Sequence, residues 1–334
     1  MRADPLFFIP HPSSFIPHPS SLILEKMDTF LQHLLNAIQW GSFLALIAVG
    51  YSMVYGVLLL INFAHGDIFM VGAYMGYAIG GFLLGQAALR LPIALPGWAV
   101  AVLTVLLAMA LTSLVGVAIE RVAYRPLRRR GAHRLYLVIT ALMFGLLLEY
   151  GNLALLGARD RQFPELFAKQ VYTIGGLSVT NVKLLVIALS VLTMAGLWFL
   201  VQRTRWGMAM RAVSYDRLAV PLMGISTDTV IVITFIVGSS LAALAGVMYG
   251  TAFPILSYDM GLLVGWQAFI AAVVGGIGSI RGAMIGGYIL GFLQVFVVAF
   301  LPSTYRDLIA FSLLLLVLTV RPTGLFGVAR RTKV

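Results

Sequence analysis

Nine apolar stretches follow one another along the chain, and polar connections separate them. They run over Ile38–Leu60, Ile68–Leu84, Trp98–Ile119, Leu135–Leu156, Leu184–Val201, Val230–Gly250, Leu262–Ile277, Ala283–Leu301 and Leu308–Val320. A helix of about 20 apolar residues crosses the hydrocarbon core of a bilayer. The pattern therefore predicts an all-α, polytopic membrane protein with about eight or nine transmembrane helices. The shorter stretches favour helices that are discontinuous or re-entrant.

The composition agrees with this pattern. Of 334 residues, 60% are hydrophobic and 10% are charged, whereas soluble domains carry about 25% charged residues. This leaves no room for a sizeable soluble domain. The absence of cysteine excludes disulfides, thiolate metal sites and cysteine nucleophiles. Neither a convergent catalytic set nor a metal-ligand set can be assembled, so we expect no enzyme activity and no bound metal.

The first residues differ from the rest of the chain. The heptapeptide FIPHPSS occupies Phe8–Ser14 and again Phe15–Ser21. Because proline disfavours both helix and central strand, we expect residues 1–26 to be a disordered or spurious extension, with Met27 as an alternative start, or else a recognition tail. The predicted transmembrane domain covers residues 27–327, and residues 328–334 are expected to form a cytoplasmic tail.

Basic residues predict the orientation. The net charge of +11 arises mainly in three regions, 121–134, 203–217 and 321–333. The positive-inside rule places these in the cytoplasm and the loops 86–97, 157–183 and 251–261 outside. This placement explains the charge without nucleic acid. Three stretches precede the first basic loop, which puts the N-terminus outside unless the opening pair is one span plus a re-entrant segment.

Polar residues interrupt the apolar pattern at INFAHGDIF, Ile61–Phe69. Asn62, His65 and Asp67 flank the permissive Gly66 there. Polar groups in hydrocarbon are costly unless they are paired. One interpretation is structural, with Asn62 ending one half-helix and Asp67 capping the next. The other is that a discontinuous helix lines a translocation path, as transporters often arrange it.

A second interruption reads GGIGSIRGAMIGG, Gly275–Gly287. A phosphate-binding loop would need a preceding strand and a following lysine, and this segment has neither. The pattern instead predicts two close-packed helices that meet at a tight break, with Arg281 facing the cytoplasm or a water-filled cavity. Paired breaks in the two halves of a transporter indicate its path, so Gly275, Gly276 and Gly278 are candidate path residues.

Four further polar residues lie within the apolar stretches. Glu149 and Asn152 lie near the external end of the fourth stretch, where we expect them to be interfacial or paired to a neighbouring helix. Gln267 and Gln294 are expected to form hydrogen bonds between helices, which is the common use of such residues in membranes.

The connection Arg203–Ser226 is amphipathic. Met208, Val213, Leu218 and Leu222 recur every four or five residues between charged positions, a pattern too polar to span a membrane and too apolar for a free loop. Such a segment lies on lipid headgroups or inserts into a groove of a soluble partner.

Five ordered blocks resemble one known family. They read MVYGVLLLINFAHGDIFMVGAY, ERVAYRPLR, RWGMAMRAVSYDRLAVPLMGI, AAVVGGIGSIRGAMIGGYILG and RPTGLFG. Together they are similar, from about Met27 to Gly327, to the LivH-type permease subunit of branched-chain amino-acid ABC importers. Urea-importer permeases share the NFAHG-type block, so the substrate class stays open between amino acids and urea or short amides.

The resemblance implies a set of partners. These are a second homologous permease subunit, two cytoplasmic ATPase subunits that bind the ATP and magnesium, and an extracytoplasmic substrate-binding protein, all at a bacterial inner membrane. The family's ATPase-coupling loop matches Arg205, Gly207, Arg211, Asp216 and Gly224. A secondary transporter or channel that works alone is the main rival, although ion coupling would call for more paired intramembrane charges. A purely structural membrane protein is another.

Overall fold

All nine apolar stretches are helical in the computed structural model, which describes residues 19–88, 96–217 and 219–327. Seven helices are long and apolar enough to cross a membrane, and two have 16 residues each. The nine helices are α1 (Pro19–Leu58), α2 (His65–Ala88), α3 (Gly97–Ile119), α5 (Arg134–Leu156), α6 (Asn181–Arg203), α9 (Thr227–Ala252), α10 (Met260–Gly275), α11 (Ile280–Phe300) and α12 (Tyr305–Val320). The predicted all-α, polytopic class is confirmed.

Helix α1 begins earlier than the pattern predicts. It has 40 residues and starts at Pro19, so its first two turns occupy 19–26 within the segment that was expected to be irregular. Proline is compatible with a first helical turn because the first N–H groups of a helix have no intrahelical partner. Residues 1–18 and the tail 328–334 lie outside the described residues.

Helices α1 and α9 form the centre of the bundle. In the most apolar 18-residue stretch of α1, 89% of the residues are buried, and in α9 the share is 72%. Helices α5 and α6 lie at the periphery, with 22% and 28%. A peripheral helix in a membrane protein presents its apolar side chains to lipid or to another subunit, so these two helices mark the outer surface of the bundle.

Small residues set the spacing of the central helices. A Cβ on Gly72 of α2 would overlap the backbone of Ala243 in α9, and a Cβ on Gly287 of α11 would overlap Ala45 in α1. In lipid, close backbone approach of this kind is a main source of helix association. The structural interpretation of the many glycines therefore holds at these contacts.

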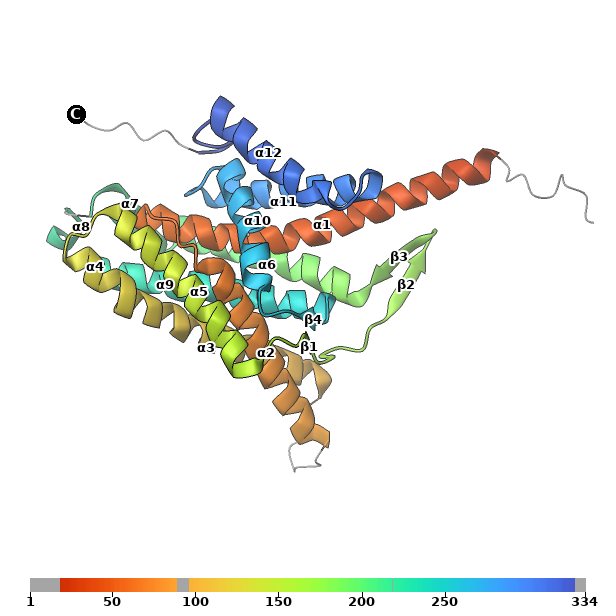
Figure 1. Cartoon of the computed structure of the whole chain (residues 1–334), viewed down its shortest axis with the longest axis horizontal. Helices are drawn as coiled ribbons and strands as arrows, with labels where there is room; N and C mark the ends of the chain where they lie inside the picture. The colour runs from red at the N-terminus through yellow and green to blue at the C-terminus, as the bar shows by residue number, and fades with distance from the viewer. Residues whose placement is uncertain (1–18, 89–95, 218, 328–334) are drawn as a thin grey trace, which may run out of the picture.

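The basic connections gather at one end of the bundle. Figure 1 shows α4 (Arg125–Arg129), α7 (Arg205–Tyr215) and α8 (Ala219–Leu222) close together there, while strands β2 (Val171–Ile174) and β3 (Leu177–Thr180) project from the other end. Gln32 near the start of α1 accepts a hydrogen bond of 3.0 Å from Ser178 N. The start of α1 therefore lies at the hairpin end, which agrees with an external N-terminus.

Two predicted external loops pair with each other. Strand β1 (Arg161–Gln162) runs antiparallel to β4 (Ile255–Leu256), and Phe163 N donates to Pro254 O at 2.8 Å. Phe163 and Leu256 are buried beneath this sheet. The pairing joins the connection after α5 to the connection after α9, and it fixes the external end of the bundle.

Candidate functional site

The chain folds back into the bundle between α1 and α2. Leu59 ends α1 in the left-handed region, with φ of 55°, and α2 starts at His65 after a non-helical segment. The His65 ring lies against Gly50 and 4.8 Å from the ring of Tyr51. Gly50 precedes the end of α1 by eight residues, about 12 Å along a helix. The predicted break is therefore present, and α2 begins deep within the bundle.

Helices α2 and α10 cross where both begin. A Cβ on Gly66 would overlap the carbonyl oxygen of Gly261 and lie 2.6 Å from Gly265 Cα. Side chains are excluded from this crossing because the two backbones touch. The N-terminal ends of the two helices, whose N–H groups lack intrahelical partners, therefore meet inside the bundle.

A cavity of about 220 Å³ adjoins this crossing. Asp67 of α2 and Glu149 of α5 line it, and its walls are almost entirely apolar. The apolar lining includes Phe63, Leu142, Met143, Leu146, Trp266 and Phe269. Met143 and Leu146 are also partly exposed on the outer surface of α5, so the cavity reaches the surface of the bundle between α5 and α10.

The two carboxyl groups in this cavity lack basic partners. Asp67 is 5% exposed and Glu149 is 8% exposed, and none of the ion pairs formed by the described residues includes either of them. Asp67 Oδ1 is buried and has no hydrogen-bond partner within the described chain. An isolated carboxylate in an apolar cavity is costly, so the site is well suited to a cationic group that enters from outside the subunit.

The other predicted path residues at this break have packing roles in the structure. Asn62 Oδ1 accepts a hydrogen bond of 3.0 Å from Tyr124 Oη, and Asn62 O accepts one from His65 N. His65 is 1% exposed, and neither it nor Asn62 lines the cavity. Asp67 lies within the first turn of α2 rather than at its cap. Of the four residues, only Asp67 faces the cavity.

The second break, between α10 and α11, has a packing role. Gly276 and Gly278 have φ values of 111° and 90°, and a Cβ on Gly275 would overlap the backbone of Gly282. Leu325 N and Phe326 N donate to Val274 O and Gly275 O at 3.0 and 2.9 Å. The RPTGLFG segment thus satisfies the last carbonyl groups of α10.

The prediction of two close-packed helices is confirmed at this break. Gly275, Gly276 and Gly278 do not line the cavity, so the structure does not join them to Asp67. Arg281 is exposed, and its guanidinium lies 5.4 Å from the centre of the Trp198 ring.

The connection Arg203–Ser226 contains two short helices, α7 and α8, and not one continuous amphipathic helix. Met208 is 60% exposed and Leu222 is 87% exposed, whereas Val213 is fully buried. Helix α7 is amphipathic and buries Ala209, Met210 and Val213. Met208 is five residues from Val213, about 140° around the helix, and so lies on the other face. Leu222 belongs to α8, which begins after α7 has ended at Tyr215, so the expectation that these residues share one face is wrong. Leu218 lies outside the described residues.

Local bonds fix the predicted coupling residues in place. Gly207 N donates to Thr204 Oγ1 at 3.2 Å, and a Cβ on Gly207 would overlap the carbonyl of Val201. Arg211 donates to that same carbonyl of Val201. Asp216 Oδ1 accepts from Ala219 N at 3.1 Å at the start of α8.

The outer part of the same connection is held by a local turn, in which Gly224 N donates to Pro221 O at 3.0 Å. Gly224 is exposed with φ of 75°, and Arg205 is exposed as well. The five residues therefore share one surface segment, held by its inner side to the end of α6.

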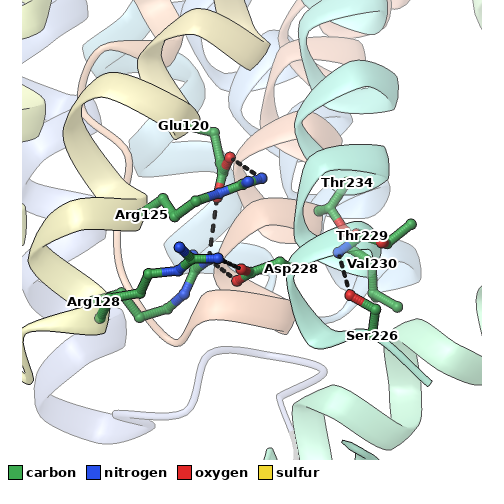
Figure 2. Close-up of polar contacts among 9 residues, drawn as sticks. Glu120, Arg125, Arg128, Ser226, Asp228, Thr229, Val230 and Thr234 are labelled. Atoms are coloured by element: carbon green, nitrogen blue, oxygen red, sulfur yellow. Dashed lines mark hydrogen bonds and ion pairs between the residues drawn. The ribbon is translucent and has the colours of Figure 1, made fainter. Parts of the chain in front are cut away.

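An ion network ties the first basic loop to the start of α9. The π-helix η2 (Glu120–Tyr124) follows α3 and buries Glu120 completely. Arg125 and Arg128 donate to the Glu120 carboxylate at 2.9 and 3.2 Å, and Arg128 also reaches Asp228 Oδ1 at 2.5 Å. Figure 2 shows Arg128 between the two acids. Ion pairs therefore join the first basic loop to α9, the helix that follows the predicted coupling segment, Arg205–Gly224.

Interhelical hydrogen bonds involve the predicted amide residues. Gln267 Nε2 of α10 donates to Asp307 Oδ1 of α12 at 3.3 Å, and Trp40 Nε1 of α1 donates to Gln294 Oε1 of α11 at 2.6 Å. Asn152 Nδ2 contacts Met70 Sδ at 3.6 Å. These expectations are confirmed.

Glu149 is neither interfacial nor ion-paired among the described residues, in contrast to the prediction from the sequence, but is 8% exposed and lines the cavity. Its carboxyl group shares the cavity with Asp67, 82 positions earlier in the chain. Its position inside an apolar stretch was a signal of function, but the partner element could only be found in three dimensions.

Comparison with known proteins agrees with this architecture. The family model described as "Branched-chain amino acid transport system / permease component" matches residues 33–318. The chain belongs to this permease family. The high-affinity branched-chain amino acid transport system permease protein LivH of Escherichia coli K12 is 40% identical over 303 residues, covering 89% of this chain and 96% of that protein. BraD of Pseudomonas aeruginosa, described in the same words, is 38% identical with the same coverage.

A more distant relative matches over a similar share of the chain. A probable branched-chain amino acid transport permease protein LivH of Methanocaldococcus jannaschii is 28% identical over 308 residues, covering 88% of this chain and 91% of that protein. The permease is thus a multi-pass membrane transport protein, and its relatives are transport permease proteins.

Proposed function

We propose that the permease is the membrane-spanning subunit of an ATP-driven importer of branched-chain amino acids in the bacterial inner membrane. The cavity beside the α2–α10 crossing carries this proposal. Its two unpaired carboxyl groups suit an ammonium group, and its apolar walls suit a branched aliphatic side chain. Urea offers neither group, so the chemistry of the cavity favours an amino acid over urea or a short amide.

A second, homologous permease subunit covers the opening of the cavity. The rim is apolar, with Met143 53% and Leu262 44% exposed, which by itself would suit lipid. The carboxyl groups just behind this rim would then lie next to hydrocarbon, which is costly. A partner subunit that encloses the cavity and admits water removes this cost, and it places the translocation path between two subunits.

Transport proceeds by alternating access, driven by ATPase subunits that bind below α7 and α8. Met208 and Tyr215 of α7, Leu222 of α8 and the adjacent Met223 are each exposed. Exposed apolar side chains of this kind insert into a groove on a soluble partner. Nucleotide state biases the permease only through contacts that differ between its conformations. The ATP and magnesium bind to the ATPases, and an extracytoplasmic protein delivers the substrate.

Uptake measurements test the proposal. The permease is expressed with its partner subunits in cells that lack their own branched-chain amino-acid uptake, and radiolabelled leucine and urea are compared. We expect leucine to accumulate only with active ATPase subunits. Urea uptake without leucine uptake would replace the substrate assignment, and leucine accumulation without the ATPases would favour a secondary transporter.

Variants of the carboxyl groups test the cavity itself. We expect Asp67→Asn and Glu149→Gln each to lower leucine uptake at least tenfold, which corresponds to about 1.4 kcal/mol, at unchanged expression. Asp160→Asn, in the exposed loop after α5, is the matched control and should transport normally. Normal leucine uptake by the double variant would show that neither carboxyl group is needed for translocation.

A further inference from the structure

A second cavity, far larger than the first, opens at the external end of the bundle. It encloses about 780 Å³. Lys183 lies in the first turn of α6, Arg306 begins α12, and Ala299 and Phe253 lie at the ends of α11 and α9. Four helix ends meet here, at the hairpin end of the bundle. This depth corresponds to the headgroup region of the outer leaflet.

The cavity is cationic. Lys169, Lys183 and Arg306 line it, and none of its lining residues is acidic. Lys183 is only 9% exposed, and its ammonium group is held by a neutral amide, Asn36 Oδ1 at 2.7 Å. Arg306 lies 3.7 Å from Asp307, whose Oδ1 also accepts from Gln267. Positive charge therefore exceeds negative charge around the cavity.

A buried donor also lacks a partner in this cavity. Gln294 is 1% exposed and its Nε2 has no hydrogen-bond partner among the described residues, while its Oε1 is taken by Trp40. A buried N–H group without an acceptor is unfavourable. Helices α6 and α12 also begin here, and the positive ends of their dipoles favour an anion.

The remaining walls are apolar and continue to the lipid-facing surface. Trp40, Tyr249 and Phe253 form an aromatic wall. Val298 both lines the cavity and is 44% exposed, and Phe300 beyond it is 76% exposed. An acyl chain could thus leave the cavity along α11 and remain in the hydrocarbon.

We propose that this cavity binds an anionic phospholipid from the outer leaflet, with the phosphate between Lys183 and Arg306 and an acyl chain along α11. A zwitterionic amino acid fits less well, because its ammonium group would find no carboxylate among the lining residues. The lipid would join α1, α6, α9, α11 and α12. It would attach the peripheral helix α6, and with it α7 of the coupling segment, to the centre of the bundle.

Native mass spectrometry of the assembled transporter in detergent tests this site. Phosphatidylglycerol, phosphatidylcholine and L-leucine are the probes, added separately and in competition. We expect phosphatidylglycerol to be retained in preference to phosphatidylcholine. The Lys183→Gln/Arg306→Gln variant should bind it at least fivefold more weakly, whereas Arg159→Gln, an exposed external residue outside the cavity, should bind it normally.

A second variant separates the binding site from general effects on folding. Ala299→Trp fills the cavity without changing its charge and should also displace the lipid. Two controls confirm that this variant is folded: leucine uptake in cells, and the melting temperature of the purified protein in lipid-free detergent. Equal retention of phosphatidylglycerol by the wild type and both cavity variants would overturn the proposal. Displacement of the lipid by leucine would overturn it in favour of a substrate site.

Discussion

Replacement of Arg128 by methionine should destabilise the permease measurably. The Arg128 guanidinium is 18% exposed and bridges the fully buried Glu120, at 3.2 Å, and Asp228, at 2.5 Å. Methionine retains much of the packing of the arginine stem but removes the charge and both ion pairs. Glu120 would retain Arg125, and Asp228 would retain Arg129. Each carboxylate therefore loses one ion pair and keeps one basic partner.

The magnitude follows from these contacts. A hydrogen bond that involves a charged group contributes about 1.5–3 kcal/mol, and breaking a buried ion pair outright costs about 3–5 kcal/mol. Because both acids keep one partner, we expect Arg128→Met to cost about 2–3 kcal/mol. The matched control is Arg129→Met. Arg129 is 67% exposed and pairs only with Asp228, and exposed pairs contribute about 0–1 kcal/mol.

Thermal unfolding of the purified protein, followed by tryptophan fluorescence, distinguishes the two variants. One kcal/mol shifts Tm by about 2–4 °C for 150–250 residues, and the shift falls with chain length. At about 2 °C per kcal/mol for this chain of 334 residues, we expect a shift of about 4–6 °C for Arg128→Met and under about 2 °C for Arg129→Met. Equal shifts for the two variants, or no shift for Arg128→Met, would refute the idea that the bridge fixes the basic loop to α9.

Three further predictions concern close contacts and docking. Gly66→Ala should lower Tm and uptake because its Cβ overlaps the backbone of Gly261, whereas Gly81→Ala, in open space on the same helix, should not. Gly207→Ala should uncouple ATP hydrolysis from transport by pushing α7 away from the end of α6, and coupling equal to that of the wild type would contradict this. Leu222→Asp, at a position 87% exposed, should reduce co-purification of the ATPase subunits without changing Tm; unchanged co-purification would move the docking surface elsewhere.

The apolar pattern predicted the helices well because each helix must satisfy its own backbone in lipid. The stretches Trp98–Ile119 and Leu135–Leu156 coincide with α3 and α5 to within one residue at each end. The four- and five-residue spacing from Met208 to Leu222 did not define one helical face. Five residues advance about 140° around a helix, and α7 ends at Tyr215 before α8 begins. The apolar pattern also missed the start of α1, because proline in a first turn reads as a breaker.

Features that depend on the meeting of distant segments were beyond the sequence. Asp67 was recognised because a charged group in hydrocarbon is energetically costly. Glu149, which lines the same cavity, lies on α5, a helix that contacts α2 only after folding. The closure of α10 by Leu325 and Phe326 is likewise a tertiary contact. The break at Gly276 was predicted correctly, whereas its place on the translocation path stays a prediction, because glycine serves both tight helix packing and water-exposed backbone.

Cysteine labelling tests the central claim, that the cavity at Asp67 and Glu149 is a wetted part of the path. The chain has no native cysteine, so Leu146→Cys, which lines the cavity, and Leu147→Cys, which does not and is 61% exposed, can be compared directly in the assembled transporter. We predict that a membrane-impermeant thiosulfonate labels position 146 at a rate that changes with nucleotide, and that it leaves position 147 unlabelled in lipid. Absence of labelling at position 146 in every nucleotide state would contradict the account.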